Sequence, residues 1–198
     1  MAALAALAER PDRIFQLFLL NEVNEQKYYS VKMLYKGKWL TIDMDEYVPF
    51  LYGKPAFTKA KENELWVVLL EKAWAKLYSS YKRIEAGYPE EGLHDLTGAP
   101  VRQIVLQGAT FDREKEWRYL VDASQREYAM VSSSQPGSDT NKSVSGVVQG
   151  HAYTFLNATT LNFQGQQHRV VQLRNPWGKG ESKGQWSDAD PNWQYVSA

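Results

Sequence analysis

The chain of 198 residues contains no cysteine. This absence excludes disulfide bonds and every metal site that depends on a thiolate ligand. It fits a reducing compartment, although secreted proteins without cysteine exist. The apolar start of the chain, residues 1–7, lacks the basic region of a signal peptide and is soon followed by Glu9, Arg10 and Pro11. We expect these residues to belong to a buried helix.

An excess of charge is also missing, because 23 Lys and Arg balance 23 Asp and Glu. A net charge of zero gives no indication of a nucleic-acid partner or of an anionic membrane surface. No apolar run is long enough to cross a bilayer. Aromatic residues, in contrast, are abundant, with seven Trp and twelve Tyr. The composition is therefore that of a globular protein with a thick apolar core and no membrane segment.

The first half of the chain predicts helices and one hairpin. The clearest helix is residues 63–81, where apolar residues recur at helical spacing and Asn63 can cap the first turn. The other expected elements are a helix at 2–9, a short helix after Pro11, a hairpin of strands 27–35 and 38–43, a loop at 43–55, and a short turn at 93–100.

The second half predicts mostly strands. We expect strands at 101–107, 128–132, 147–156 and 168–174, with one helix at 112–125. A domain boundary near Gly98 divides the chain into residues 1–98 and 99–198. Helices in one half and strands in the other predict an α+β fold with two unlike lobes.

His151 and Asn175 are the residues that could carry chemistry. His151 follows Gly150, whose missing side chain lets the backbone pass close to another segment, and begins one expected strand. Asn175 ends the next strand, so a hairpin would place the two side chains together. Each residue also has a simpler interpretation, a structural histidine and an Asn-Pro turn starter. In cysteine proteases such a histidine takes the thiol proton and the asparagine orients it.

The pair lies within motifs that resemble those of calpains. Gln149-Gly-His-Ala-Tyr153 and Val171-Gln-Leu-Arg-Asn-Pro-Trp-Gly178 resemble the histidine and asparagine signatures of that family. Asn63-Glu-Leu-Trp66, Asp95-Leu-Thr-Gly98 and Gln185-Trp-Ser-Asp188 resemble other calpain segments in the same order, and the loop before His151 is most like the plant branch. The resemblance implies a papain-like fold of two lobes that cleaves protein substrates through an acyl-enzyme.

The same resemblance implies roles for individual residues. His151 would be the general base, Asn175 would orient it, and Trp177 would shield their hydrogen bond from water. Calpain cores also bind Ca²⁺ in loop sites, one in each lobe. Glu64 matches a ligand of the first lobe, and Glu181 and Asp188 match ligands of the second; each is otherwise an exposed carboxylate. Oxygen ligands of this kind suit a hard cation.

The chain departs from the family at the nucleophile. Residues 2–9 resemble the continuation of the helix that carries the catalytic Cys, so that Cys would fall upstream of Met1. We expect the chain alone to be inactive and its first lobe to be truncated at the N-terminus. Three explanations remain open: part of an active calcium-dependent cytoplasmic endopeptidase that needs the missing N-terminal part of the core, a pseudoprotease that binds proteins, or a scaffold in which the pair is only packing.

Overall fold

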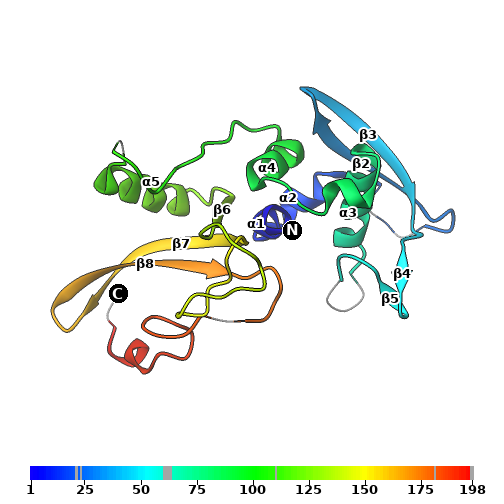
Figure 1. Cartoon of the computed structure of the whole chain (residues 1–198). Coiled ribbons are helices and arrows are strands. Elements are labelled where there is room, and N and C mark those ends of the chain that lie inside the picture. The colour runs from blue at the N-terminus through cyan, green and yellow to red at the C-terminus, as the bar shows by residue number, and fades with distance from the viewer. Residues whose placement is uncertain (21, 23, 60–63, 110, 181, 197–198) are drawn as a thin grey trace. The chain divides into compact units, whose positions relative to one another are not determined.

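The computed structural model describes residues 1–20, 22, 24–59, 64–109, 111–180 and 182–196 (Figure 1). These residues form two compact units. The N-terminal unit is Leu7–Val101, and the C-terminal unit combines Met1–Ala6 with Arg102–Ala198. Helices and antiparallel sheets are present, which confirms the α+β class. The assignment of residues 1–98 and 99–198 as the two lobes of a protease stays a prediction.

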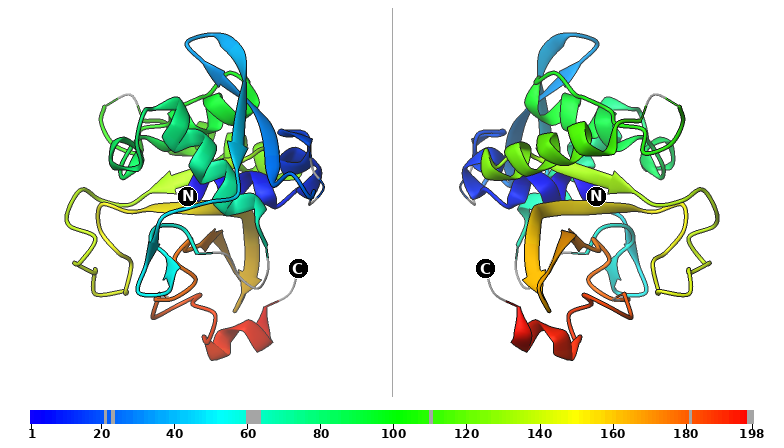
Figure 2. Two further views of the ribbon diagram at one scale, coloured as in Figure 1. Left: turned by 90° about the vertical axis from the view of Figure 1, so that its right-hand side faces the viewer. Right: turned by 90° about the vertical axis from the view of Figure 1, so that its left-hand side faces the viewer.

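The N-terminal unit is built on an antiparallel sheet with the order β1-β2-β3. Its strands and helices are β1 (Phe18–Leu20), β2 (Tyr28–Tyr35), β3 (Lys38–Asp45), α2 (Pro11–Phe15), α3 (Trp66–Leu77), the 3-10 helix η1 (Tyr81–Ile84) and α4 (Pro89–Thr97). The expected hairpin is confirmed, and Figure 2 shows it as a long twisted ribbon. β1 is an element that the sequence did not reveal. Helix α1 (Ala2–Ala8) precedes α2; its first five residues belong to the C-terminal unit, and it is buried along most of its length.

Helix α3 is shorter than the expected helix at 63–81. It ends before Ser79, whose φ of 77° is incompatible with a continuing helix. The expected cap, Asn63, lies outside the described residues. The predicted turn at 93–100 was wrong in part, because residues 93–97 belong to α4. Pro89 begins α4 and Gly98 ends it in the left-handed conformation, at φ 67°.

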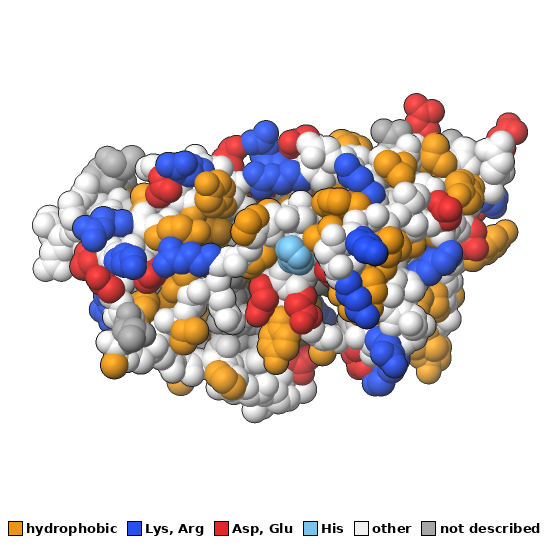
Figure 3. Space-filling model, turned by 90° about the horizontal axis from the view of Figure 1, so that it is seen from above, with side chains coloured by type: hydrophobic (Ala, Val, Ile, Leu, Met, Phe, Trp, Pro, Cys, Tyr) orange, Lys and Arg blue, Asp and Glu red, His pale blue; other side chains and the backbone are white. Residues whose placement is uncertain are grey.

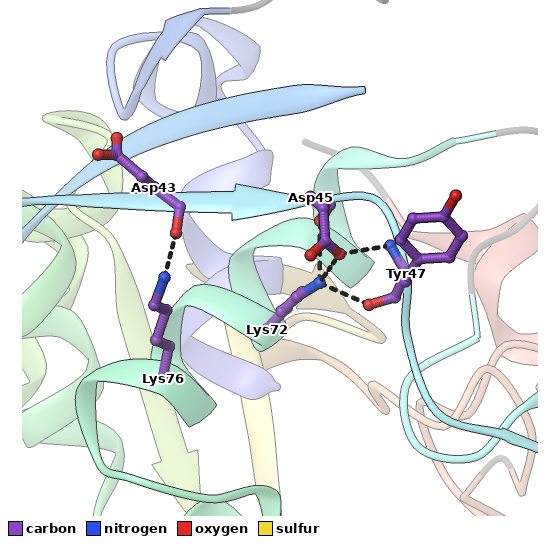
Figure 4. Close-up of polar contacts among 5 residues, drawn as sticks. All are labelled: Asp43, Asp45, Tyr47, Lys72 and Lys76. Atoms are coloured by element: carbon purple, nitrogen blue, oxygen red, sulfur yellow. Dashed lines mark hydrogen bonds and ion pairs between the residues drawn. The ribbon is translucent and has the colours of Figure 1, made fainter. Parts of the chain in front are cut away.

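The predicted loop at 43–55 was wrong in part. β3 continues to Asp45, and a second hairpin follows, made of β4 (Phe50–Leu51) and β5 (Lys54–Pro55). Figure 4 shows how α3 holds the segment before this hairpin. The Lys72 ammonium donates to the Asp45 carboxylate, to the Asp45 carbonyl at 3.0 Å and to the Tyr47 carbonyl at 2.5 Å. One turn later, Lys76 donates to the Asp43 carbonyl at 2.5 Å.

The C-terminal unit contains a second antiparallel sheet, with the order β6-β7-β8. Its elements are α5 (Arg113–Gln125), β6 (Met130–Ser133), β7 (Ala152–Phe163), β8 (Gln166–Arg174) and the 3-10 helix η2 (Pro191–Tyr195). Asp112 caps α5 by accepting from the N–H groups of Glu114 and Lys115, both at 3.0 Å. The Ser124 side chain of α5 accepts from the Ala158 N–H of β7 at 3.0 Å, so helix and sheet are joined.

One strand prediction in this unit was wrong, and another was wrong at its start. Residues 101–107 belong to no strand in the described chain and contain a bend at Leu106. Residues 147–151 precede β7 rather than belong to it, because Gly150 has φ 54° and the Val148 N–H donates to the Tyr153 hydroxyl instead of a ladder. The remaining strands and α5 agree with the sequence to within a few residues.

The surface carries both signs of charge. Figure 3 shows one face on which Lys and Arg side chains are interspersed with Asp, Glu and hydrophobic side chains. In the part of the chain that the structure describes, no helix is both long and apolar enough to cross a membrane.

Candidate active site

His151 and Asn175 meet at one end of the β7–β8 pair. His151 immediately precedes β7 and Asn175 immediately follows β8, and the antiparallel register pairs Thr154 with Arg174. The beginning of one strand therefore lies beside the end of the other. His151 Nε2 is 2.9 Å from Asn175 Oδ1. The structure thus brings together the two residues that the sequence singled out.

The surroundings of Asn175 define which atom of its amide faces the histidine. Asn175 Nδ2 donates to the Lys179 carbonyl at 2.8 Å, and Oδ1 accepts from the Trp177 N–H at 3.1 Å. Because an amide oxygen only accepts, His151 Nε2 must be the protonated nitrogen. The neutral ring then has its lone pair on Nδ1, which is the atom left to take a proton from a reacting group. Asn175 is only 6% exposed, so water competes little for these bonds.

Two aromatic rings hold the imidazole of His151. The Trp177 ring lies tilted against it at a centroid distance of 4.3 Å, and Tyr153 meets it edge-on at 5.0 Å. Trp177 is itself 46% exposed, so it forms the outer cover of the site. The Tyr153 hydroxyl accepts from the buried Val148 N–H at 2.9 Å, which fixes the inner ring. Rotation of the imidazole is therefore restricted on two sides.

The backbone of His151 is fixed by Ser134, a residue that the sequence did not single out. The Ser134 N–H donates to the His151 carbonyl at 2.9 Å. The Ser134 hydroxyl accepts from the His151 N–H at 3.0 Å and donates to the His151 carbonyl at 3.1 Å. Both backbone groups of the histidine are thus occupied. Ser134 follows β6 in a run of three serines, and nothing in such a run marks it for this contact.

Gly150 allows two backbone segments to cross beside the site. A Cβ added to Gly150 would lie 2.1 Å from the Gly137 carbonyl oxygen, far inside contact distance. Gly150 also has φ 54°, in the left-handed region that glycine tolerates best. Its N–H donates to the Gln135 carbonyl at 2.8 Å. The requirement for glycine before His151, expected from the sequence, has this crossing as its physical basis.

The start of α1 lies against β7. The Thr154 hydroxyl, fully buried, donates to the Ala2 carbonyl at 3.2 Å. Thr154 is three residues beyond His151 on the same strand, so the first turn of α1 belongs to the neighbourhood of the histidine. Ala2, Ala3 and Leu4 are buried there.

The structure describes two of the three carboxylates proposed for calcium, Glu64 and Asp188. Among the residues that the structure describes, no three His, Asp or Glu side chains come close enough to share a metal ion. Glu64 is exposed beside a mainly apolar cavity of about 460 Å³, and Asp188 is exposed in a turn of the C-terminal unit. Glu181 lies outside the described residues. Since Ca²⁺ takes six to eight oxygen ligands, a site built on Glu64 or on Asp188 would need further ligands besides that one carboxylate.

Asp190, two residues from Asp188, is committed to the backbone. Its carboxylate accepts from the N–H of Asn192 at 2.9 Å and from the N–H of Trp186 at 2.5 Å, and these bonds hold the pKa of Asp190 below its usual range. This carboxylate shapes the turn that carries Asp188.

The other two histidines have different surroundings. His94 Nδ1 is 3.1 Å from the Ala99 carbonyl at the end of α4 and is exposed. His168 is half-buried on β8, with the Phe163 and Trp186 rings at 5.9 and 5.5 Å. Neither has an amide or carboxylate partner comparable to Asn175 among the described contacts.

Comparison with known proteins agrees with this geometry. A family model described as "Calpain family cysteine protease" matches residues 1–198. The calpain-type cysteine protease DEK1 of Arabidopsis thaliana is 38% identical over 200 residues, covering 98% of this chain and 9% of the relative. Calpain-14 of Homo sapiens is 32% identical over 202 residues, covering 100% of this chain and 29% of the relative. The chain therefore spans less than a third of the length of these relatives.

Proposed function

This chain belongs to the calpain family of cysteine proteases, and from that premise we propose that it carries the histidine–asparagine half of a catalytic site for peptide-bond hydrolysis. Membership of the family also confirms the expected fold class, an α+β papain-like protease domain. The observation that carries the proposal is the 2.9 Å hydrogen bond between His151 Nε2 and Asn175 Oδ1, which leaves Nδ1 as the basic nitrogen. The substrates would be peptide segments within proteins.

The chemistry requires a thiol that the chain does not contain. In the proposed reaction, His151 Nδ1 takes the thiol proton, and the thiolate attacks the carbonyl carbon of the scissile bond. The imidazolium then protonates the leaving amine, and an acyl-enzyme remains. Nδ1 next takes a proton from water, whose hydroxide attacks the acyl carbon and displaces the thiolate. The imidazolium returns its proton to the sulfur, which regenerates the thiol. Asn175 keeps the ring oriented in every step, and Trp177 limits access of water to their bond.

We place the missing thiol on residues that precede α1 in a longer polypeptide. Support comes from the contact between Thr154 and the Ala2 carbonyl, because it puts the first turn of α1 on the strand that follows His151. A nucleophile at the beginning of such a helix would also benefit from the helix dipole, which lowers the pKa of a thiol.

Calcium dependence is proposed for that longer polypeptide only. Glu64 and Asp188 would each supply one carboxylate, and other ligands would come from outside the described residues. Isothermal titration of Ca²⁺ into this chain is expected to show no binding in the micromolar range. Micromolar binding that disappears in Asp188→Asn would show that the chain holds a site of its own.

A peptidase assay tests the proposed function. The chain alone is expected to show no turnover of a fluorogenic peptide, with or without calcium. In a polypeptide extended to include the thiol, His151→Ala is expected to abolish turnover, and Asn175→Ala to lower kcat by about 10²-fold or more. His168→Ala is the matched control and should retain turnover. Equal activity of the His151→Ala and His168→Ala proteins would contradict the proposal.

The absence of cysteine favours a second function, a non-catalytic module that binds proteins. A thiol-free chain that binds segments of other proteins would hold them without cleaving them. If the extended polypeptide cannot be obtained because no thiol-encoding sequence precedes Met1 in frame, this second function becomes the one to pursue.

A further inference from the structure

The segment between β3 and α3 has an unusual composition. Within it, residues 47–59 contain two lysines, Lys54 and Lys59, and no acidic residue; Glu46 precedes this stretch, and Lys61, Glu62 and Glu64 follow it. Four aromatic residues and a leucine accompany them: Tyr47, Phe50, Leu51, Tyr52 and Phe57. The zero net charge of the whole chain conceals this local excess of positive charge and aromatic surface.

The apolar side chains at the tip of this segment are exposed on both faces of the β4–β5 hairpin. Phe50, Leu51 and Tyr52 are 64%, 57% and 95% exposed. Phe50 and Leu51 are consecutive strand residues, so their side chains point to opposite faces. Tyr52 lies in the turn between β4 and β5. The tip is therefore apolar all round.

The turn itself does not require an aromatic residue. Tyr52 and Gly53 both have positive φ, 51° and 74°. The same arrangement recurs in the β2–β3 and β7–β8 turns, at Lys36-Gly37 and Gln164-Gly165. Those two hairpins put a polar side chain at the first position, which is the ordinary choice for a turn in water. Turn geometry therefore does not explain why this position carries an aromatic side chain, Tyr52.

Both ends of the segment are anchored to consecutive residues of α3. Lys72 donates to the Asp45 and Tyr47 carbonyls, at 3.0 and 2.5 Å, as Figure 4 shows. The Thr58 N–H donates to the Glu71 carboxylate at 3.0 Å. Phe57 stacks on Tyr81 with ring centroids 4.6 Å apart and an interplanar angle of 5°. Both ends of the segment are therefore anchored, whereas the apolar side chains at its tip, labelled β4 and β5 in Figure 1, remain exposed.

We infer that the tip of the β4–β5 hairpin inserts Phe50, Leu51 and Tyr52 into the interface of an anionic lipid surface. An apolar tip exposed on both faces matches a medium that surrounds it, whereas a protein partner would cover one face. Tyr and Phe suit the boundary between lipid headgroups and acyl chains. Lys54 and Lys59 are exposed and no acidic residue lies within residues 47–59, so these two lysines complement anionic headgroups.

Pairing with a second copy through the strand edge fits less well. β4 and β5 are two residues long, and Pro55 within β5 lacks the N–H that a strand edge would offer. A single shallow anchor of this kind gives weak and reversible binding, as for other single membrane anchors. The hairpin would therefore act together with another attachment of the longer polypeptide rather than hold the protein at a membrane alone.

The absence of cysteine makes a direct test possible, because one introduced thiol is unique. Tyr52→Cys is labelled with an environment-sensitive fluorophore and mixed with vesicles of phosphatidylcholine, with or without phosphatidylserine. We expect a blue shift and a rise in intensity that depend on phosphatidylserine and decrease with salt. The matched control is Val144→Cys with the same label, since Val144 is fully exposed on a loop of the C-terminal unit.

Two further variants of the labelled protein separate the contribution of the apolar tip from that of the lysine charge. Phe50→Ser with Leu51→Ser should abolish the shift, and Lys54→Glu should weaken partitioning by at least about fivefold while leaving the apolar tip intact. Circular dichroism checks that each variant is folded. The inference is overturned if neither vesicle changes the Tyr52→Cys signal, if the Val144→Cys label responds equally, or if the signal rises with protein concentration in the absence of lipid.

Discussion

His151 Nε2 and Asn175 Oδ1 lie 2.9 Å apart although 24 positions separate the two residues in the chain. Asn175 is buried and has its own partners, the Lys179 carbonyl and the Trp177 N–H, so its orientation does not depend on the histidine. The asparagine therefore acts as a fixed acceptor that selects one tautomer of the ring. This selection is the property that a proton-transferring histidine needs.

Replacement of Gly150 by alanine should destabilise the protein far more than the same change at a turn glycine. The added methyl group would meet the Gly137 carbonyl oxygen at 2.1 Å, and the backbone is left-handed. We expect a loss of about 2–4 kcal/mol in unfolding free energy. Gly165→Ala is the control, because Gly165 has φ 75° but nothing within 4 Å, and it should cost about 1 kcal/mol. Equal urea midpoints for the two variants would refute the crossing of the two segments.

Removal of the Trp177 ring should make His151 more accessible without unfolding the chain. The ring lies 4.3 Å from the imidazole and is partly exposed, so Trp177→Ala removes a cover rather than core packing. The rate of His151 modification by diethyl pyrocarbonate, followed by peptide mass spectrometry, should rise several-fold. Trp39→Ala, at an exposed tryptophan of β3, is the control and should leave this rate unchanged. A slower or unchanged rate in Trp177→Ala would count against shielding.

Asp95 should make stability depend on pH. It is a buried residue of α4 and accepts at 2.7 Å from the hydroxyl of Tyr78, which directly follows α3. Burial raises the pKa of Asp95, and the Tyr78 hydrogen bond offsets this in part. A raised folded-state pKa means that the folded protein binds the proton more tightly than the unfolded chain. The stabilisation that protonated Asp95 gives the folded state is fully present below the ordinary carboxyl pKa. It is lost as pH rises through the folded-state pKa of Asp95.

Asp95→Asn should therefore be more stable than the native chain at neutral pH, by about 1 kcal/mol, with the difference vanishing in acid. The asparagine can still accept from Tyr78. Tyr78→Phe should destabilise by about 1–3 kcal/mol, because it leaves the buried carboxylate without that donor. Urea unfolding at several pH values measures both effects, with the exposed Asp139→Asn as control. A loss of stability in Asp95→Asn at neutral pH would show that the carboxylate is stabilising as an ion.

Local patterns were sufficient to predict most of the secondary structure, and the spacing of His151 and Asn175 was sufficient to predict their meeting. In an antiparallel hairpin the start of the first strand lies beside the end of the second, so strands at the expected positions bring His151 and Asn175 together. The role of Trp177 was expected from the family resemblance, and its place beside the pair follows from its position two residues beyond Asn175. The start and end of α4 were also visible in principle, as Pro89 and Gly98, but the segment was too short to be separated from a turn.

Long-range contacts were not predictable. Ser134 holds the His151 backbone and Thr154 binds Ala2, and both pairings depend on how distant segments fold together rather than on any local signal. The β4–β5 hairpin was interpreted as loop because its strands have two residues each and one contains proline. The metal roles of Glu64, Glu181 and Asp188 rested on family resemblance alone and stay predictions.

The most direct test of the account is the tautomer of His151, measured by long-range ¹H–¹⁵N correlation NMR on the chain itself. We predict that the neutral ring carries its proton on Nε2 and that Asn175→Ala shifts it toward a mixture of tautomers. Asn157→Ala, at an exposed asparagine on β7, should leave the spectrum of His151 unchanged. A native ring protonated on Nδ1, or one insensitive to Asn175→Ala, would contradict the claim that this pair is the acid–base half of a catalytic site.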